Sequence, residues 1–184
     1  AAERELLQWL AKGYHGDMDY MAAHGTKRTR PAELLPGTLS IISARLPYWP
    51  ENARDADAVL ADPMLAYISR YALGRDYHKV LRDRQKLASR IETACLEIGL
   101  GRLQYRVFTD SAPVMEVALA AQTALGWRGK HTLLLNREAG SYFFLGEIYA
   151  ALPLPPDPPA SAHCGSCSAC LGACPTGAFV APYV

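Results

Sequence analysis

The chain has 184 residues, of which 50% are hydrophobic and 20% charged, with 13 prolines and 14 glycines. This composition excludes disordered, collagen-like and coiled-coil proteins. Nineteen lysines and arginines balance eighteen aspartates and glutamates, so the net charge of +1 gives no global attraction to nucleic acid or to a membrane. The apolar runs are far shorter than the roughly 18 residues of a membrane span, and no leader opens the chain. We therefore expect a soluble, cytoplasmic protein of one domain with an appendage.

The first predicted element is an amphipathic helix over residues 1–12, which Gly13 ends. This helix starts without a capping residue, so we expect further residues upstream of it. A short apolar run predicts a buried strand over residues 37–44, and the prolines within 47–50 are expected to end it.

A second, longer amphipathic helix is predicted from Asp76 to Ile98, because apolar residues recur there at intervals of three, four and seven. Cys95 lies on its apolar face and is expected to be buried. Alternation predicts a strand over residues 103–109, after which residues 110–113 are expected to open a helix that ends near Gly126.

Two further strands are predicted over residues 132–136 and 142–148, separated by a polar turn. Residues 152–160 contain five prolines, which favours an extended and stiff connection. The expected organisation is a mixed α/β domain over residues 1–151, a proline-rich linker over 152–160 and a small cysteine-rich module that begins at 161.

Four of the five cysteines lie within eleven residues near the end of the chain, a density typical of a metal site and not of a disulfide framework. Cys164, Cys167, Cys170 and Cys174 have the C-x2-C-x2-C-x3-C-P spacing of bacterial ferredoxins, in which the fourth cysteine ligates the other cluster of a pair. A zinc site is the alternative, but structural zinc usually takes two ligand pairs with a longer spacer.

Two complete clusters need eight cysteines, and this run supplies four. We therefore interpret the chain as a fragment of a longer protein. If it is complete, the run holds at best one cluster with three or four protein ligands.

Several segments taken together resemble the epoxyqueuosine reductase family. The combination is more specific than the ferredoxin spacing alone and covers nearly the whole chain. The segments are Met18–Met21, Lys27–Pro31, Ile68–His78, Asp110–Pro113, Leu125–Lys130, Leu135–Ser141 and the cysteine run through Tyr183.

This resemblance implies an α/β (α+β) cobalamin-binding domain, related in fold to the reductive dehalogenases, followed by part of a ferredoxin-like 4Fe-4S module. It implies reduction of epoxyqueuosine to queuosine at the wobble position of tRNA. Two 4Fe-4S clusters in a full-length member would pass electrons singly from an external donor to cobalamin bound base-off. The implied partner is the anticodon stem-loop, and a monomer is expected.

The resemblance also implies roles for individual residues. Asp110 matches the proposed proton donor and a cobalamin contact, although an aspartate before Ser-Ala-Pro also fits a helix N-cap. Leu134, Asn136, Ser141 and Leu145 are the further candidates for cobalamin binding. The sequence lacks an Asp-x-His-x-x-Gly motif, which suits an open lower face of the cobalt.

Lys27, Arg28 and Arg30 are the candidates for phosphate contacts with the tRNA, with a solvated surface loop as the alternative. Tyr71 or Tyr77 is a candidate for stacking on a base or packing against the corrin, whereas His78 alone is more typical of a polar surface residue.

Two other functions remain open from the sequence. One is a cobalamin reductase of the dehalogenase type, which would lack a basic rim facing RNA. The other is a plain electron-transfer protein, which a bound corrinoid would exclude.

Overall fold

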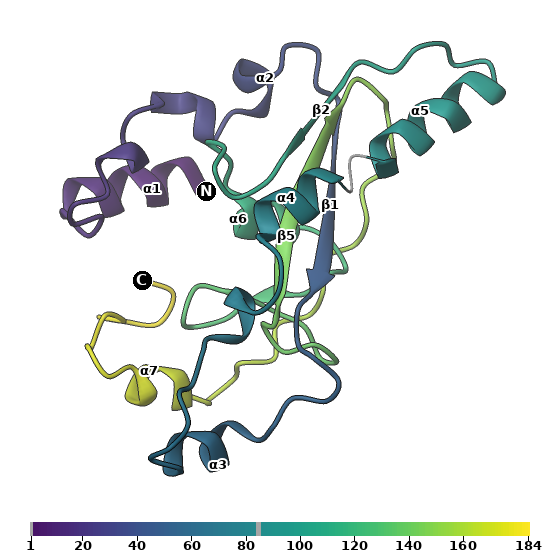
Figure 1. The fold of residues 1–184 in the computed structure, drawn as a ribbon. Coiled ribbons are helices and arrows are strands. Elements are labelled where there is room, and N and C mark those ends of the chain that lie inside the picture. The colour runs from purple at the N-terminus through teal and green to yellow at the C-terminus, as the bar shows by residue number, and fades with distance from the viewer. Residues whose placement is uncertain (1, 84–85) are drawn as a thin grey trace.

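The computed structural model describes residues 2–83 and 86–184. Its centre is a three-stranded antiparallel sheet in which β5 (Phe143–Ala150) lies between β1 (Ser40–Pro47) and β2 (Tyr105–Phe108). Figure 1 shows β5 flanked by these two strands at the middle of the molecule. The long strand β5 therefore carries side chains that contact elements from both halves of the chain.

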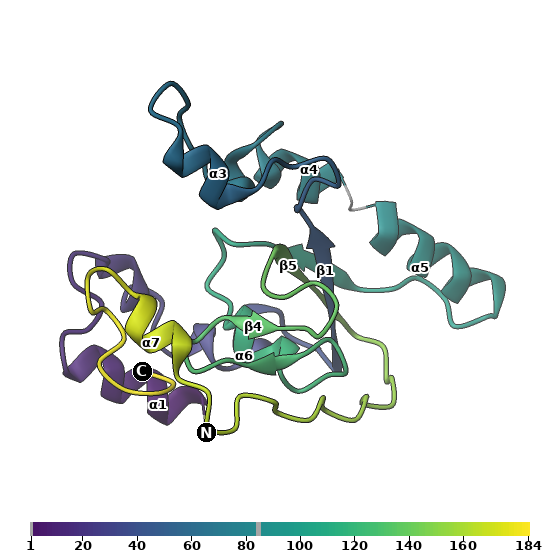
Figure 2. The ribbon, with the colours of Figure 1, turned by 90° about the horizontal axis from the view of Figure 1, so that it is seen from below.

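Helices and short turns surround this sheet, and α6 contacts both β1 and β5. The longest helix, α5, extends away from the sheet in both views (Figures 1 and 2). The helices are α1 (Ala2–Ala11), α2 (Pro31–Leu34), α3 (Ala56–Ala61), α4 (Tyr77–Asp83), α5 (Lys86–Glu97), α6 (Glu116–Ala120) and α7 (Ala169–Ala173), with 3-10 turns η1 (Asp19–Met21), η2 (Gly25–Arg28) and η3 (Arg70–Ala72).

The core lies between α6 and one face of the sheet. Alternate residues of a strand point to the same face, so Phe143, Leu145, Glu147 and Tyr149 share one side of β5. Tyr149 packs with Phe108 and Val114, and Phe143 packs with Ala120 and Leu134, in two apolar clusters. Glu147 therefore sits on the core-facing side among apolar neighbours.

A second, two-stranded sheet pairs β3 (Trp127–Arg128) with β4 (Leu134–Leu135). The proline-rich residues 152–160 then run along the domain in extended form toward α7 (Figure 2). The backbone N–H of Leu154 donates to Ser40 Oγ at 3.0 Å, and that of Ala160 donates to the Thr123 carbonyl at 3.0 Å. These bonds tie the segment to the domain surface.

Most predicted elements are confirmed with shifted ends. The predicted first helix is α1, followed by Gly13 with a positive φ of 69°. The strand predicted to stop before Pro47 includes it, because β1 is an edge strand, where a proline need not donate to a neighbour. Helices α4 and α5 cover the long helix predicted from Asp76, with residues 84–85 outside the described part, and Cys95 is buried as expected.

The helix predicted to open at residues 110–113 and to end near Gly126 is wrong in its start and in its end, since α6 ends at Ala120. Helix α6 begins only at Glu116, because Asp110 has a φ of 40°, which an α-helix cannot accommodate. The mixed α/β fold class is confirmed. Within the described residues, no helix is long and apolar enough to cross a membrane.

Candidate active site

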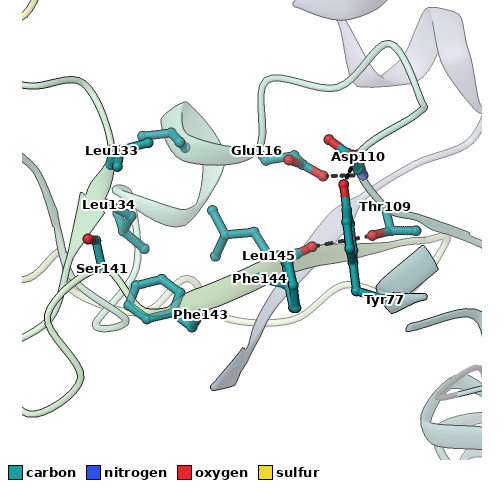
Figure 3. A pocket seen from close by; sticks show the side chains of 11 residues that line it. Tyr77, Thr109, Asp110, Glu116, Leu133, Leu134, Ser141, Phe143, Phe144 and Leu145 are labelled. Carbon is teal, nitrogen blue, oxygen red and sulfur yellow. Dashed lines mark hydrogen bonds between the residues drawn. The ribbon is translucent and has the colours of Figure 1, made fainter. Parts of the chain in front are cut away.

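An open cavity of about 190 Å³ borders the end of β5 near α4 and α6. Figure 3 shows its side chains pointing inward from both sheets, from α4 and α6 and from the Asp110 loop. Most of the wall is apolar, and five side chains bring polar atoms to it. The lining residues are Tyr77, Thr109, Asp110, Glu116, Val117, Leu133, Leu134, Ser141, Phe143, Phe144 and Leu145.

Asp110 follows strand β2 and turns the chain toward α6. Its φ of 40° lies in the left-handed region, which aspartate adopts more readily than most residues. The backbone N–H of Asp110 donates to Oε1 of Glu116 at 2.7 Å. This turn leaves the half-exposed carboxylate at the cavity wall.

Two neighbouring residues at the start of α4 contact the same oxygen of Asp110. The hydroxyl of Tyr77 donates to Asp110 Oδ2, and Nε2 of His78 lies 2.9 Å from that atom. The other ring nitrogen of His78, Nδ1, lies 3.0 Å from Oδ1 of Asp76. His78 therefore bridges two carboxylates. We call Tyr77, His78 and Asp110 the Asp110 cluster.

The hydrogen bonds of His78 limit which groups of the Asp110 cluster can donate a proton. An imidazole can donate from both nitrogens only when it is protonated, so a neutral His78 requires a proton on Asp76 or Asp110. Hydrogen bonding to His78 lowers the pKa of Asp76. Burial, and then the bond to Asp110, raise the pKa of Tyr77, so its phenol stays a donor at neutral pH.

A partly buried carboxyl group, Glu116, and a fully buried one, Glu147, lie next to the cluster. Burial raises the pKa of Glu116 to about 7. Burial, and then the nearby Glu116, raise the pKa of Glu147 to about 9, so Glu147 is neutral at pH 7. Neither carboxyl oxygen of Glu147 has a hydrogen-bond partner among the described residues, which is unusual for a fully buried polar group.

Four of the five residues predicted to bind the cofactor line this cavity: Asp110, Leu134, Ser141 and Leu145. Asn136 does not line it, because its side chain is used within the chain. Its Nδ2 donates to the Leu125 carbonyl at 2.8 Å, and its Oδ1 accepts from the backbone N–H of Glu138 at 2.9 Å. Its predicted contact with a cofactor stays a prediction.

The N-cap interpretation of Asp110 is wrong. Its carboxylate accepts from Tyr77 and faces His78, and no backbone N–H of α6 donates to it in the described contacts. The residue in the N-cap position of α6 is Met115, whose side chain makes no capping bond. Asp110 is therefore available for chemistry at the cavity.

The predicted basic patch is divided by the fold. Arg28 is buried, and its Nη2 donates to the Tyr20 carbonyl at 3.1 Å. Arg30 forms ion pairs with Glu3 at 2.8 Å and Glu33 at 3.2 Å. Lys27 is exposed and forms no ion pair within the described chain, so it is the cation of the three best placed to meet a phosphate.

The cysteine run is anchored to the β3–β4 loop. Nζ of Lys130 donates to the carbonyls of Gly165 at 2.8 Å and Cys167 at 2.7 Å. The backbone N–H of Ala178 donates to Sγ of Cys174 at 3.3 Å, as donors do to cluster thiolates. Among the described residues, no three cysteine, histidine or acidic side chains lie close enough together to hold a metal ion. The cluster therefore stays a prediction from the cysteine spacing.

Sequence reasoning did not find His78 and Glu116 as parts of this site. It treated His78 as a surface residue and left Glu116 without a role. The adjacent Asp76, Tyr77 and His78 were a usable signal, because a phenol and an imidazole at a helix start can converge on one acceptor while the aspartate orients the imidazole. Nothing in the sequence indicated that a distant aspartate would be that acceptor.

The comparisons with known proteins show what this chain is similar to. Residues 28–111 match the family model described as "Epoxyqueuosine reductase QueG, DUF1730". The epoxyqueuosine reductase of Pseudomonas aeruginosa is 61% identical over 183 residues, which is 98% of this chain and 49% of that protein. The chain spans about half the length of the curated relatives it matches.

Solved structures show the same fold. A crystal structure of epoxyqueuosine reductase with an epoxyqueuosine-modified tRNA-Tyr stem loop matches with a TM-score of 0.77 and 28% identity, over 99% of this chain and 46% of that one. A structure of the Bacillus subtilis epoxyqueuosine reductase, with an aspartate-bearing catalytic loop swung out of the active site, matches with a TM-score of 0.75, 28% identity and the same coverage.

The chain thus has a mixed α/β fold like that of the solved epoxyqueuosine reductases. The resemblance expected from the sequence is confirmed, and the chain is similar to epoxyqueuosine reductases over about half of their length.

Proposed function

We propose that the protein formed by this chain reduces epoxyqueuosine to queuosine in tRNA. The reaction removes the epoxide oxygen as water and consumes two electrons and two protons. The observation that carries the proposal is the Asp110 cluster, which brings a carboxylate, a phenol and an imidazole together beside an apolar cavity in a chain similar to these reductases.

Asp110 is the proposed proton donor to the departing oxygen. Its Oδ2 already lies within hydrogen-bond reach of Tyr77 and of Nε2 of His78. A proton that leaves Oδ2 can be replaced from His78, whose ring also faces Asp76. Tyr77 keeps the carboxylate oriented, because its ring is stacked on Phe144 and its phenol stays protonated.

The position of Asp110 on a loop also supports this role. The Bacillus subtilis relative has a catalytic loop that carries an aspartate and swings out of its active site. We infer that the turn between β2 and α6 corresponds to that loop, because Asp110 is the aspartate that this chain brings to the cavity wall.

The cavity suits one edge of a corrin ring. Leu134, Phe143 and Leu145 form an apolar wall with the Ser141 hydroxyl beside it. The volume of about 190 Å³ is smaller than the roughly 300–1,000 Å³ of a site that encloses a whole ligand, so most of the ring would lie outside it. When bound, cobalamin would supply the reducing chemistry at the epoxide, while this chain would exclude water and supply the proton.

The remaining proposals rest on the resemblance and the cysteine spacing. Residues 161–184 begin a ferredoxin-like 4Fe-4S module, with Cys164, Cys167 and Cys170 on one cluster and Cys174 on a second. The partner is the anticodon stem-loop, as in the solved relative, with Lys27 on a phosphate. An external electron donor, a monomeric state and a cytoplasmic location complete the proposal.

The experiment replaces the matching half of the Pseudomonas aeruginosa relative with residues 1–184 of this chain. The chimera is reconstituted anaerobically with iron, sulfide and cobalamin, then supplied with a strong reductant and an epoxyqueuosine-modified stem-loop. Mass spectrometry of the nucleosides should show queuosine. A chimera that binds clusters and cobalamin but forms no queuosine contradicts the proposal, and a bound corrinoid with dechlorinating activity alone would indicate the dehalogenase alternative.

A further inference from the structure

Glu116 connects the Asp110 loop to helix α6. It is the first residue of that helix, and its Oε1 accepts the backbone N–H of Asp110 at 2.7 Å. Figure 3 shows its carboxylate at the cavity wall, pointing toward Asp110. Glu116 thus contacts the peptide of the proposed proton donor and leaves the reactive carboxylate of Asp110 to other partners.

The backbone of Asp110 needs such a contact. Its left-handed φ of 40° is disfavoured for any residue with a Cβ, so it persists only where surrounding contacts hold it. Two of the contacts come from α4 and act on the side chain, through Tyr77 and His78. The contact from Glu116 acts on the peptide itself, and the described residues supply no other partner for that N–H.

We propose that Glu116 is a positioning residue, whose carboxylate holds the Asp110 peptide and thereby keeps the Asp110 side chain over the cavity. The inference rests on the proposed function in one respect, namely that Asp110 donates the proton. The hydrogen bond and its effect on the loop do not depend on that role.

The strength of the hydrogen bond between Glu116 and the Asp110 N–H depends on the charge of Glu116. An ionised carboxylate accepts a hydrogen bond more strongly than a neutral carboxyl group. Burial raises the pKa of Glu116 to about 7. The ionised form, and with it the stronger hydrogen bond to the Asp110 N–H, is therefore lost as the pH falls below that value. Glu147 is neutral in this range and adds no charge. The titratable groups that interact with Glu116 are Asp110 on the loop, Tyr77 on α4, and Glu147 and Tyr149 on β5, and His78 contacts Asp110.

Nuclear magnetic resonance of the 184-residue chain tests the contact without any assay of activity. An amide proton bonded to a carboxylate shifts when that carboxylate titrates. The Asp110 amide signal should therefore titrate with a midpoint near pH 7, well above the ordinary range of a glutamate. In Glu116→Gln the amide oxygen still accepts the bond but cannot ionise, so this titration should disappear.

The hydrogen-exchange rate of the Asp110 amide distinguishes the effect of the hydrogen bond to Glu116 from the effect of the charge of Glu116. Glu116→Ala removes the acceptor, so the Asp110 amide should exchange with solvent about tenfold faster or more, whereas Glu116→Gln should retain protection. Glu147→Gln is the matched control, because it removes the neighbouring carboxyl and leaves the bond to Asp110 intact. It should change neither the exchange rate nor the midpoint near pH 7.

A titration that persists in Glu116→Gln, or an unchanged exchange rate in Glu116→Ala, overturns the inference. Steady-state kinetics of the chimera then test whether the contact affects catalysis. Glu116→Ala should lower kcat about tenfold with KM little changed, and Glu116→Gln should restore kcat at neutral pH while abolishing its fall below pH 7. An inactive chimera in which the Asp110 amide still titrates with Glu116 would count against the proposed function and leave the contact standing.

Discussion

The ring of Tyr77 lies flat on the ring of Phe144, with 4.2 Å between the ring centroids and 9° between the planes. Tyr77 begins α4 and Phe144 belongs to β5, so this contact fixes a helix against the central strand. It also directs the Tyr77 hydroxyl to Asp110, which is 33 positions away in the sequence. The orientation of the proposed proton donor thus depends on a stacked aromatic pair.

Tyr77→Phe separates these two roles. The phenylalanine keeps the stack on Phe144 and loses the donor to Asp110. A hydrogen bond to a charged group contributes about 1.5–3 kcal/mol, so kcat of the chimera should fall by roughly 10- to 100-fold. Thermal unfolding should change little. An unchanged kcat would show that Tyr77 acts only in packing.

The buried Glu147 makes stability depend on pH. Its pKa rises from an ordinary 4.5 to about 9 in the folded chain, so the folded state holds a proton that the unfolded state has released. The free energy of unfolding should therefore fall as the pH rises between these values, by up to about 1.4 kcal/mol per pH unit. Glu116, with a pKa of about 7, also loses its proton in the lower part of the interval from pH 7 to 8.5, so the share of Glu147 is the difference between the wild type and Glu147→Gln.

Urea unfolding of the wild type and of Glu147→Gln at pH 7 and 8.5 measures this effect. The wild type should lose more stability than the variant over that interval. Equal losses in the two proteins would mean that Glu147 is already ionised, or solvated, in the folded state.

The three basic residues near η2 should behave differently from one another. Lys27→Ala should weaken stem-loop binding by the chimera and lower the log–log slope of affinity against salt by about 0.7–0.9. Arg28→Ala should mainly reduce stability, because it removes a buried bond to the Tyr20 carbonyl. Arg30→Ala should release the pair with Glu3, whose pKa, now about 2, should rise. Equal effects of all three on RNA affinity would contradict this division.

Asn136 and Ser141 form a matched pair for cofactor binding. Asn136→Ala removes bonds to the Leu125 carbonyl and the Glu138 N–H, so it should destabilise the chain by about 1–3 kcal/mol. Its effect on the Kd for cobalamin, measured by titration of the folded chimera, should be small. Ser141→Ala should show the reverse, because Ser141 lines the cavity. A large loss of cobalamin affinity in Asn136→Ala would show that Asn136 contacts the cofactor.

Local patterns in the sequence predicted the central elements of this fold. The apolar run of β1 and the periodicity around Cys95 report burial on one face, which is a property of each segment by itself. The start of α6 was mispredicted because Asp110 has a left-handed backbone that Glu116 stabilises. Such a contact overrides the capping preference of Asp-Ser-Ala-Pro.

The candidate site was predicted only in part for the same reason. Asp110, Leu134, Ser141 and Leu145 were found through a family resemblance, and they do meet at one cavity. The links of His78 to Asp110 and of Arg30 to Glu3 join residues 32 and 27 positions apart. No local pattern encodes such pairings, so the catalytic environment and the divided basic patch needed the structure.

The replacement Asp110→Asn tests the central claim most directly. Asparagine has nearly the same size and tolerates the left-handed backbone, so the fold and the bond to Glu116 should be retained, but the carboxylic proton is lost. In the reconstituted chimera, with thermal stability and cobalamin affinity measured on the same sample, the rate of queuosine formation should fall by roughly 10² to 10⁴ while both other quantities hold. Turnover at the wild-type rate in Asp110→Asn would contradict the account.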